Sequence, residues 1–197
     1  EPRQATSHLV RPGRWGIVAV AGLLVVAAAG WWLWNSRPRE RPLMPGWEAV
    51  VATIPSPALS DPFGVAVAPD GAIFVAEGIG AHRITRIGPD GTHATYAGGV
   101  EGFRDGIGAA AHFSTPSGIA VDSDGALYVA DTGNNAIRRI STDHSVTTVV
   151  PPDAGLNGPL AVAMRSDGTL VIADTYNDRI CTVGSDGRLT SIAGSGH

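Results

Sequence analysis

Three acidic residues recur at matching places along the chain, and two of them are followed by an asparagine. Glu77, Asp131 and Asp174 are separated by 54 and 43 residues. Asn134 and Asn177 each lie three residues after an aspartate. Clustered carboxylate and amide oxygens suit calcium. The same side chains often bond backbone amides in turns, and a turn repeated in every unit favours this scaffolding role. No cofactor is therefore predicted, and calcium stays an open alternative.

A second group of polar side chains lies in one long connection. Residues 97–116 read AGGVEGFRDGIGAAAHFSTP and include Arg104, Asp105 and His112. The glycines could suggest a phosphate loop, but neither a helix start nor a Gly-Lys-Ser/Thr sequence follows them. We expect Phe103 and Phe113 to fix this insertion to the fold while the glycines turn it.

Catalytic groups are not apparent elsewhere. The histidines share no common position in the repeats, and the serines lack a nucleophile elbow. Cys181 is the one cysteine, which excludes an internal disulfide. We predict a packed or semi-exposed thiol for Cys181, no catalytic residues and no histidine metal site; an enzymatic role is not favoured.

Short strands must position these side chains. Strands are expected at 118–121, 126–130, 137–140 and 145–150, with turns between them. Asp-Gly pairs recur at the turns and supply the positive φ that tight hairpins need. At one turn the pair is Asp143-His144, a costlier choice. Strand-rich units at these periods indicate the blades of an all-β propeller.

Blade geometry places the polar residues on one face. In a four-stranded blade, the hairpins between the first and second strands and between the third and fourth strands lie on one side. The middle turns and the connections between blades lie on the other. That other side is predicted to be the ligand face. The candidate residues are Glu77, Arg104, Asp105, His112, Asp131, Asn134, Asp174 and Asn177. Arg83 and Arg179 occupy equivalent places, and we expect each to pair with the nearby acid.

Three segments carry the alanine-acid step in phase and resemble the NHL repeat. They are PFGVAVAPDGAIFVAEGIGAHRITRI (62–87), PSGIAVDSDGALYVADTGNNAIRRI (116–140) and PLAVAMRSDGTLVIADTYNDRICTV (159–183). The insertion resembles that of bacterial, teneurin-like NHL proteins. The resemblance implies four-stranded blades at about 60–97, 116–150 and 159–193, and six blades in a complete protein. We therefore expect a fragment. The segment 46–52 aligns with 187–193 and predicts an extra outer strand at the start of the propeller.

An uncharged stretch precedes the repeats. Residues 15–36 carry no formal charge, and as a helix they would span about 33 Å, which matches a bilayer's apolar thickness. Tryptophans near both ends suit the headgroup region. We predict one transmembrane helix, after a basic segment 1–14 and before a Pro-rich tether 37–46 and the propeller at 47–197. A buried helix or a cleaved signal peptide are the alternatives.

Charge limits the partners. Residues 1–41 carry six Arg and two Glu, whereas residues 42–197 carry eight Arg and 16 acidic residues. An acidic repeat region argues against nucleic-acid binding, which needs clustered cations. Arginines are equal in number on the two sides of the span, so charge does not decide the orientation. We expect the propeller on the extracytoplasmic side of the membrane, with its polar turns facing away from the membrane.

These observations favour a membrane-tethered propeller that binds a protein or a small molecule through that face. One alternative is a metal-dependent hydrolase or lyase, because gluconolactonase-like and amidating-lyase propellers have similar blades and use a central metal. The innermost strands, GVAV, GIAV and LAVA, offer few ligands for one. Another alternative is the sensor domain of a receptor kinase. A fold of this kind hosts many chemistries, so the resemblance alone does not decide among them.

Overall fold

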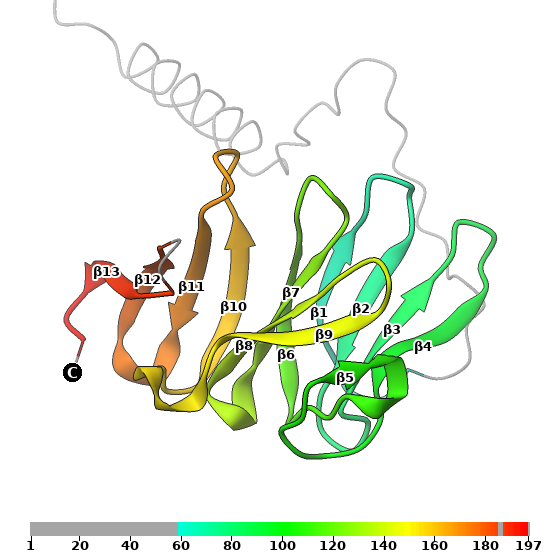
Figure 1. Ribbon diagram of the computed structural model, residues 1–197, viewed down its shortest axis with the longest axis horizontal. Coiled ribbons are helices and arrows are strands. Elements are labelled where there is room, and N and C mark those ends of the chain that lie inside the picture. Colours follow the sequence, from blue (N-terminus) through cyan, green and yellow to red (C-terminus); the bar gives the residue numbers. More distant parts are fainter. Residues whose placement is uncertain (1–58, 185–186, 197) are drawn as a thin grey trace, which may run out of the picture. The chain divides into compact units, whose positions relative to one another are not determined.

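The computed structural model describes residues 59–184 and 187–196 (Figure 1). In this part of the chain every regular element is a β-strand or a single 3-10 turn. The segments 1–14, 15–36 and 37–46 and the expected strand at 46–52 lie outside the described residues. Within the described residues, no helix has the length and hydropathy needed to cross a membrane.

Three antiparallel sheets follow one another along the chain. Each is built from four consecutive strands paired in chain order. The first sheet contains β1 (Pro62–Val67), β2 (Ile73–Glu77), β3 (Arg83–Ile87) and β4 (His93–Gly98). The middle sheet contains β6 (Pro116–Val121), β7 (Leu127–Asp131), β8 (Ala136–Ile140) and β9 (Ser145–Val150). The third sheet contains β10 (Pro159–Met164), β11 (Leu170–Asp174), β12 (Arg179–Val183) and β13 (Leu189–Gly194). The all-β prediction is confirmed for the described residues, and the four strands expected in the middle unit are present.

The middle sheet has a fifth strand that the sequence did not predict. β5 (Gly106–Ile107) comes from the insertion and pairs antiparallel with β9, the outer strand. A 3-10 turn, Gly108–Ala110, follows it. Two residues are too few to show a hydrophobic period, so the sequence pattern carried no signal for β5.

The sheets stand side by side along their first strands, as the ribbon shows (Figure 1). β1 lies against β6, and β6 lies against β10. Glycine allows this close approach. A Cβ atom on Gly64 would lie 2.2 Å from the carbonyl oxygen of Ser117, and one on Gly118 would lie 2.6 Å from Cα of Ala161. The backbones of neighbouring inner strands therefore touch directly.

Two apolar cores fill the spaces between the sheets. Phe74, Ile84 and Leu127 belong to the core between the first and middle sheets, and Ile137 and Ile172 to the core between the middle and third sheets. Among the described residues only the middle sheet is covered on both faces. The side of β1 turned away from the middle sheet is exposed, as Phe63, Val65 and Val67 show.

The connections divide between two faces. The hairpin face consists of 68–72, 88–92, 122–126, 141–144, 165–169 and the turn between β12 and β13. The insertion face consists of 78–82, 99–115, 132–135, 151–158 and 175–178. In the hairpins, Gly125 takes a left-handed backbone (φ 84°), and His144 does so as well (φ 67°). The costly turn expected at Asp143-His144 is thus present.

Gly118→Ala tests the contact between inner strands. The added methyl would meet backbone atoms of the third sheet, which cannot rotate away, so we expect a loss of about 2 to 3 kcal/mol in unfolding free energy. Ala161→Gly, the same strand position in the third sheet, is the control and should cost about 0.5 to 1 kcal/mol through backbone entropy alone. Urea unfolding followed by circular dichroism measures both. Equal effects of the two changes would contradict the close-contact explanation.

Candidate functional site

A buried acid ends the second strand of every sheet. The side chains of Glu77, Asp131 and Asp174 are fully buried. Each accepts a hydrogen bond of 2.7 Å from a backbone N–H that lies 17 residues earlier. The donors are Ser60, Ser114 and Asn157. The scaffolding interpretation required such bonds to backbone amides, although these amides belong to the connection before the sheet rather than to the turn. Each acid therefore fastens the incoming chain to its sheet.

An arginine pairs with each acid, but the middle sheet supplies it differently. Arg83 donates to Glu77 at 2.8 Å, and Arg179 donates to Asp174 at 2.7 Å. Both arginines are the first residues of third strands, and the predicted pairing is confirmed. In β8 that place is held by Ala136. The arginine is found two residues later, at Arg138, on the same side of the strand because side chains alternate. It reaches Asp131 at 3.0 Å.

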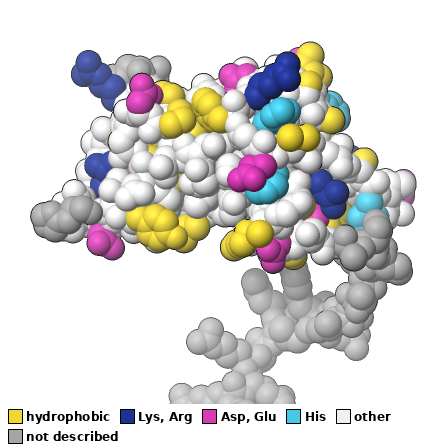
Figure 2. Space-filling model, turned by 90° about the horizontal axis from the view of Figure 1, so that it is seen from below, with side chains coloured by type: hydrophobic (Ala, Val, Ile, Leu, Met, Phe, Trp, Pro, Cys, Tyr) yellow, Lys and Arg dark blue, Asp and Glu magenta, His cyan; other side chains and the backbone are white. Residues whose placement is uncertain are grey.

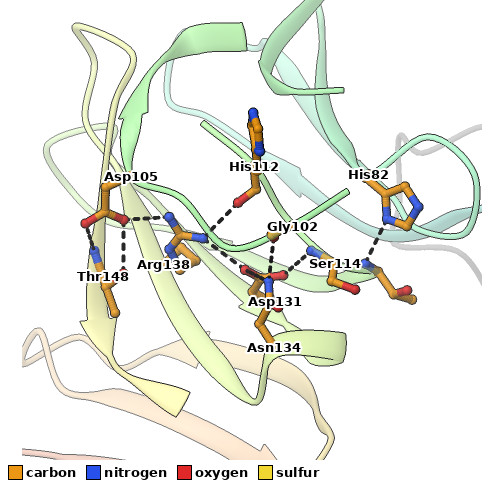
Figure 3. A network of polar contacts seen from close by, with 10 residues as sticks. His82, Gly102, Asp105, His112, Ser114, Asp131, Asn134, Arg138 and Thr148 are labelled. Atoms are coloured by element: carbon orange, nitrogen blue, oxygen red, sulfur yellow. Dashed lines mark hydrogen bonds and ion pairs between the residues drawn. The ribbon is translucent and has the colours of Figure 1, made fainter. Parts of the chain in front are cut away.

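Arg138 joins the insertion to the middle sheet (Figure 3). Its guanidinium is fully buried and donates to the backbone oxygen of His112 at 3.0 Å and to the carboxylate of Asp105 at 2.5 Å. Its charged carbon lies 4.7 Å from the ring centre of Phe103 and 5.2 Å from that of Phe113. A flat guanidinium suits both kinds of contact, since it forms paired hydrogen bonds at its edge and stacks on aromatic faces.

Asp105 extends this connection to the outer strand. Its carboxylate also accepts from the backbone N–H of Thr148 at 3.2 Å and from the Thr148 hydroxyl at 3.0 Å. β5 pairs with the start of β9 beside it. Together they cover part of a strand edge that would otherwise present open hydrogen-bonding groups. The insertion is thus held by a buried cation on one side and by strand pairing on the other.

The asparagines hold the connections as well. Asn134 donates to Asp131 at 2.8 Å and to the carbonyl of Gly102 at 2.9 Å. Asn177 makes the same pair of contacts in the third sheet, to Asp174 at 2.9 Å and to the carbonyl of Gly155 at 3.0 Å. Both amides therefore tie a buried acid to the loop above it.

Of the eight candidate residues, four meet in one network and the others do not. Asp105, Asp131 and Asn134 join through side chains, and His112 joins through its backbone oxygen. Glu77 belongs to the first sheet, and Asp174 and Asn177 belong to the third. Arg104 is exposed and pairs with His112 through the backbone.

The pKa values of two of the buried acids, Asp131 and Glu77, are shifted in opposite directions. Burial raises the pKa of Asp131, and the hydrogen bonds from Asn134, Ser114 and Arg138 only partly oppose this. Burial also acts to raise the pKa of Glu77. There the hydrogen bonds from Arg83, Thr85 and Ser60 outweigh burial and leave the pKa below its ordinary value. The difference arises because the hydrogen bonds to Asp131 offset less of the effect of burial than those to Glu77 do.

The described part of the chain has no cluster of side chains that could bind a metal ion. Among residues 59–184 and 187–196, no group of three or more His, Cys, Asp or Glu side chains gathers closely enough to hold an ion. Of the two states predicted for the Cys181 thiol, packed or semi-exposed, the structure has the packed one, because Cys181 is buried. Burial raises the pKa of that thiol, so the unreactive protonated form is favoured.

Sequence reasoning missed Arg138. The available signal was a mismatch between repeats. The first and third units place an arginine five or six residues after the acid, whereas the middle unit has Ala136 at that position. A buried acid without its usual arginine needs another cation. Arg138 was the nearest arginine on the same side of the strand.

Apolar side chains also lie exposed on the insertion face. Ile79 and Tyr176 come from the turns of the first and third sheets and are 62% and 64% exposed. Val100 and Phe103 come from the insertion and are 53% and 45% exposed. Figure 2 views the molecule from this side and shows hydrophobic side chains among acidic, basic and histidine side chains.

Comparison with known proteins agrees with this architecture. The NHL repeat family matches residues 113–140. A curated protein, SUPPRESSOR OF QUENCHING 1, chloroplastic, from Arabidopsis thaliana, is 40% identical over 84 residues, which are 42% of this chain and 8% of that protein.

Solved structures share the fold. Virginiamycin B lyase from Staphylococcus aureus is 28% identical with a TM-score of 0.54, over 68% of this chain and 41% of the lyase. A putative gluconolactonase has a TM-score of 0.50 at 14% identity, over 68% of this chain and 49% of that one, and shows likeness of fold alone. This chain spans less than half the length of each of these proteins.

The described sheets are thus blades of a β-propeller. The chain contains an NHL repeat, which runs from the end of the insertion through the third strand of the middle blade.

Arg138→Met tests the buried ion pair between Arg138 and Asp131. It leaves the Asp131 carboxylate buried without its cation, and we expect a loss of about 3 to 5 kcal/mol in unfolding free energy. Adding Asp131→Asn removes the unpaired charge and should recover at least about 1 kcal/mol. Thermal and urea unfolding of the single and double variants give the coupling.

Arg139→Met is the matched control, because Arg139 is only partly buried and donates to the Ser141 hydroxyl of its own hairpin at 2.7 Å. We expect a change of about 0.5 kcal/mol or less there. Additive effects of Arg138→Met and Asp131→Asn would show that the two residues are not coupled.

Proposed function

We propose that this chain is part of an NHL-repeat propeller that binds a protein or small-molecule partner through its insertion face. The observation that carries the proposal is the exposure of Ile79, Val100, Phe103 and Tyr176 on this face. They belong to three different connections, so the exposed apolar surface does not arise from one disordered loop. Apolar side chains that several connections expose on one face give a partner apolar area to bury.

Buried contacts hold the loops that carry these exposed residues in place, and this favours binding. The insertion is fixed by Arg138, Asp105 and β5, and the neighbouring turns are fixed by their buried acids. A surface that is already ordered loses little conformational entropy when a partner binds. Binding residues in other folds are commonly carried by loops on a rigid scaffold. The candidate acids would act here as supports, while Arg104 and the exposed apolar side chains would meet the partner.

The wider setting of the protein is part of the same proposal. We take residues 15–36, which lie outside the described residues, as a single membrane span, with a six-bladed propeller on the extracytoplasmic side. The support is the uncharged stretch in the sequence and its length. Nucleic acid is not expected as a partner, and calcium stays a secondary alternative. The sensor-domain interpretation depends on sequence upstream of this chain.

Deleting residues 15–36 should release the protein from membranes, because the propeller would lose its apolar anchor. Cell fractionation with alkaline carbonate extraction measures this. The intact chain should stay in the membrane pellet, and the deleted form should move to the supernatant. An intact chain found in the supernatant would contradict the tether.

A lyase is the second candidate. The observation that favours it is the 28% identity with virginiamycin B lyase. Against it, the inner strands of the described blades, PFGVAV, PSGIAV and PLAVAM, carry mainly small and apolar residues and offer few metal ligands. Turnover of virginiamycin B by the purified protein, lost on chelation of divalent metals, would favour this candidate over the binding module.

Photo-crosslinking tests the proposed surface. A benzoylphenylalanine at position 100 or 176 should capture a partner, since both side chains are exposed on the insertion face. The same probe at position 165, on the hairpin face, is the matched control and should capture nothing specific. Val100→Asp should then weaken binding of the captured partner at least about tenfold. Equal capture from both faces would contradict the proposal.

Point substitutions are preferable to removal of the insertion. Ala111 and Phe113 are fully buried in the core between the first and middle blades. Deleting residues 98–115 would remove this packing and would leave Arg138 without Asp105. A loss of binding in that deletion could arise from misfolding, whereas Val100 is 53% exposed and its substitution disturbs much less packing.

A further inference from the structure

A hydrogen bond between neighbouring blades recurs on the insertion face. Its acceptor is the side chain of the residue before a third strand, and its donor is the backbone N–H of the residue before the next blade's first strand. Nδ1 of His82 accepts from Thr115 at 3.2 Å (Figure 3), and Oδ1 of Asn135 accepts from Gly158 at 2.7 Å. We call the bond between His82 and Thr115 the first latch and the bond between Asn135 and Gly158 the second latch.

Left-handed backbone positions both partners of each latch. His82 and Asn135 have φ 48° and 51°, and Thr115 and Gly158 have φ 48° and 54°. Threonine is β-branched, and for such a residue this conformation is an outlier that the surrounding structure must hold in place. Thr115 is also the last residue of the insertion. The first latch therefore fastens the end of the insertion to the first blade at a strained point of the backbone.

The first latch requires an unprotonated Nδ1. A backbone N–H can only donate, so Nδ1 of His82 must offer a lone pair, and the proton of the neutral ring is on Nε2. When the ring takes up a second proton, both nitrogens carry N–H groups. Turning the ring over would then present another donor, so no orientation restores the bond with Thr115. The amide side chain of Asn135 does not titrate, so the second latch does not respond to acid.

A histidine on the hairpin face makes the opposite kind of contact between the same two blades. Nδ1 of His144 lies 3.2 Å from the backbone oxygen of Tyr96. A carbonyl oxygen can only accept, so Nδ1 of His144 donates, and it does so in both the neutral and the protonated ring. Acid therefore preserves this contact, whereas it breaks the bond that His82 accepts.

The charged groups around His82 are paired or exposed. From the insertion, Glu101 places Oε2 3.9 Å from Nε2, and its side chain is 66% exposed. The next residue in the chain, Arg83, is paired with Glu77. From the middle blade, the carboxylate of Asp131 is paired with a buried arginine. Glu101 attracts a protonated ring, but only weakly because solvent screens an exposed pair, and it does not act on the bond at Nδ1.

We infer that His82 forms an acid-sensitive latch between the first and middle blades. Its ring is 15% exposed, so protons can reach it. The neutral ring holds Thr115, and the protonated ring releases it and is attracted to Glu101. The stabilisation by the first latch is thus complete above about pH 7 and is lost as the pH falls towards about 5, the range in which histidine titrates. This inference does not depend on the binding proposed for the insertion face.

Amide hydrogen exchange of the full-length chain, followed by NMR, tests the two latches separately. Protection factors compare each amide with an unstructured chain at the same pH, so the direct effect of pH on exchange is removed. Between about pH 7.5 and about pH 5 the Thr115 amide should lose protection at least about tenfold, because only a few per cent of histidine rings stay neutral at the lower pH. The Gly158 amide should change by less than about threefold.

Two exchanges between the latches are matched variants. In His82→Asn the first blade receives the acceptor of the second latch, and asparagine tolerates the left-handed backbone. Protection of the Thr115 amide should then stay within about threefold across the same pH range. Asn135→His is the reciprocal change and should make protection of the Gly158 amide fall at least about tenfold in acid. Circular dichroism checks that each variant is folded.

Three results would overturn the inference. The first is unchanged protection of the Thr115 amide in the natural chain across this pH range. The second is an equal loss of protection at Thr115 in folded His82→Asn. The third is a joint loss at the Thr115 and Gly158 amides of the natural chain, which would indicate general acid unfolding. If His82→Asn does not fold, the two amides of the natural chain and the Asn135→His variant decide.

Discussion

The fold depends on one recurring hydrogen bond, from a backbone N–H to a fully buried carboxylate 17 residues later. It joins the chain that enters a blade to the end of the blade's second strand. A buried carboxylate is costly unless charged donors satisfy it, so each blade must also supply a cation. The acid, the amide and the arginine therefore form one unit. The insertion face of the propeller is ordered because this unit repeats.

The middle blade uses the same unit to hold the insertion as well. Moving the arginine from the first to the third position of the strand keeps its contact with Asp131. From there the guanidinium also reaches Asp105 and the Phe103 and Phe113 rings of the insertion. One buried cation thus serves both the blade and the insertion. The candidate binding surface is for this reason continuous with the core that stabilises the fold.

Much of this could be predicted, because strands and turns are local and periodic. The turns at Asp-Gly and the pairing of Arg83 and Arg179 with their acids followed from repeat alignment, whereas the alignment left Cys181 either packed or semi-exposed. β5 and the contacts of Arg138 did not, since both join segments that no repeat relates. The contact of His144 with Tyr96 was missed for a similar reason. It is formed by two blades, and the pattern within one blade does not describe the space between them.

The middle blade departs from its neighbours at two places, and these serve opposite faces. Ala136 and Arg138 replace the usual arginine arrangement, and His144 replaces a hairpin glycine. The flanking blades fold with the ordinary residues at both positions, so blade folding does not require the exchanges. The first exchange is explained by the insertion, which Arg138 holds. The second joins the middle blade to the first, because the His144 imidazole packs on the ring of Tyr96 and its Nδ1 bonds the Tyr96 carbonyl oxygen. These contacts between blades offset the cost of the left-handed backbone at His144.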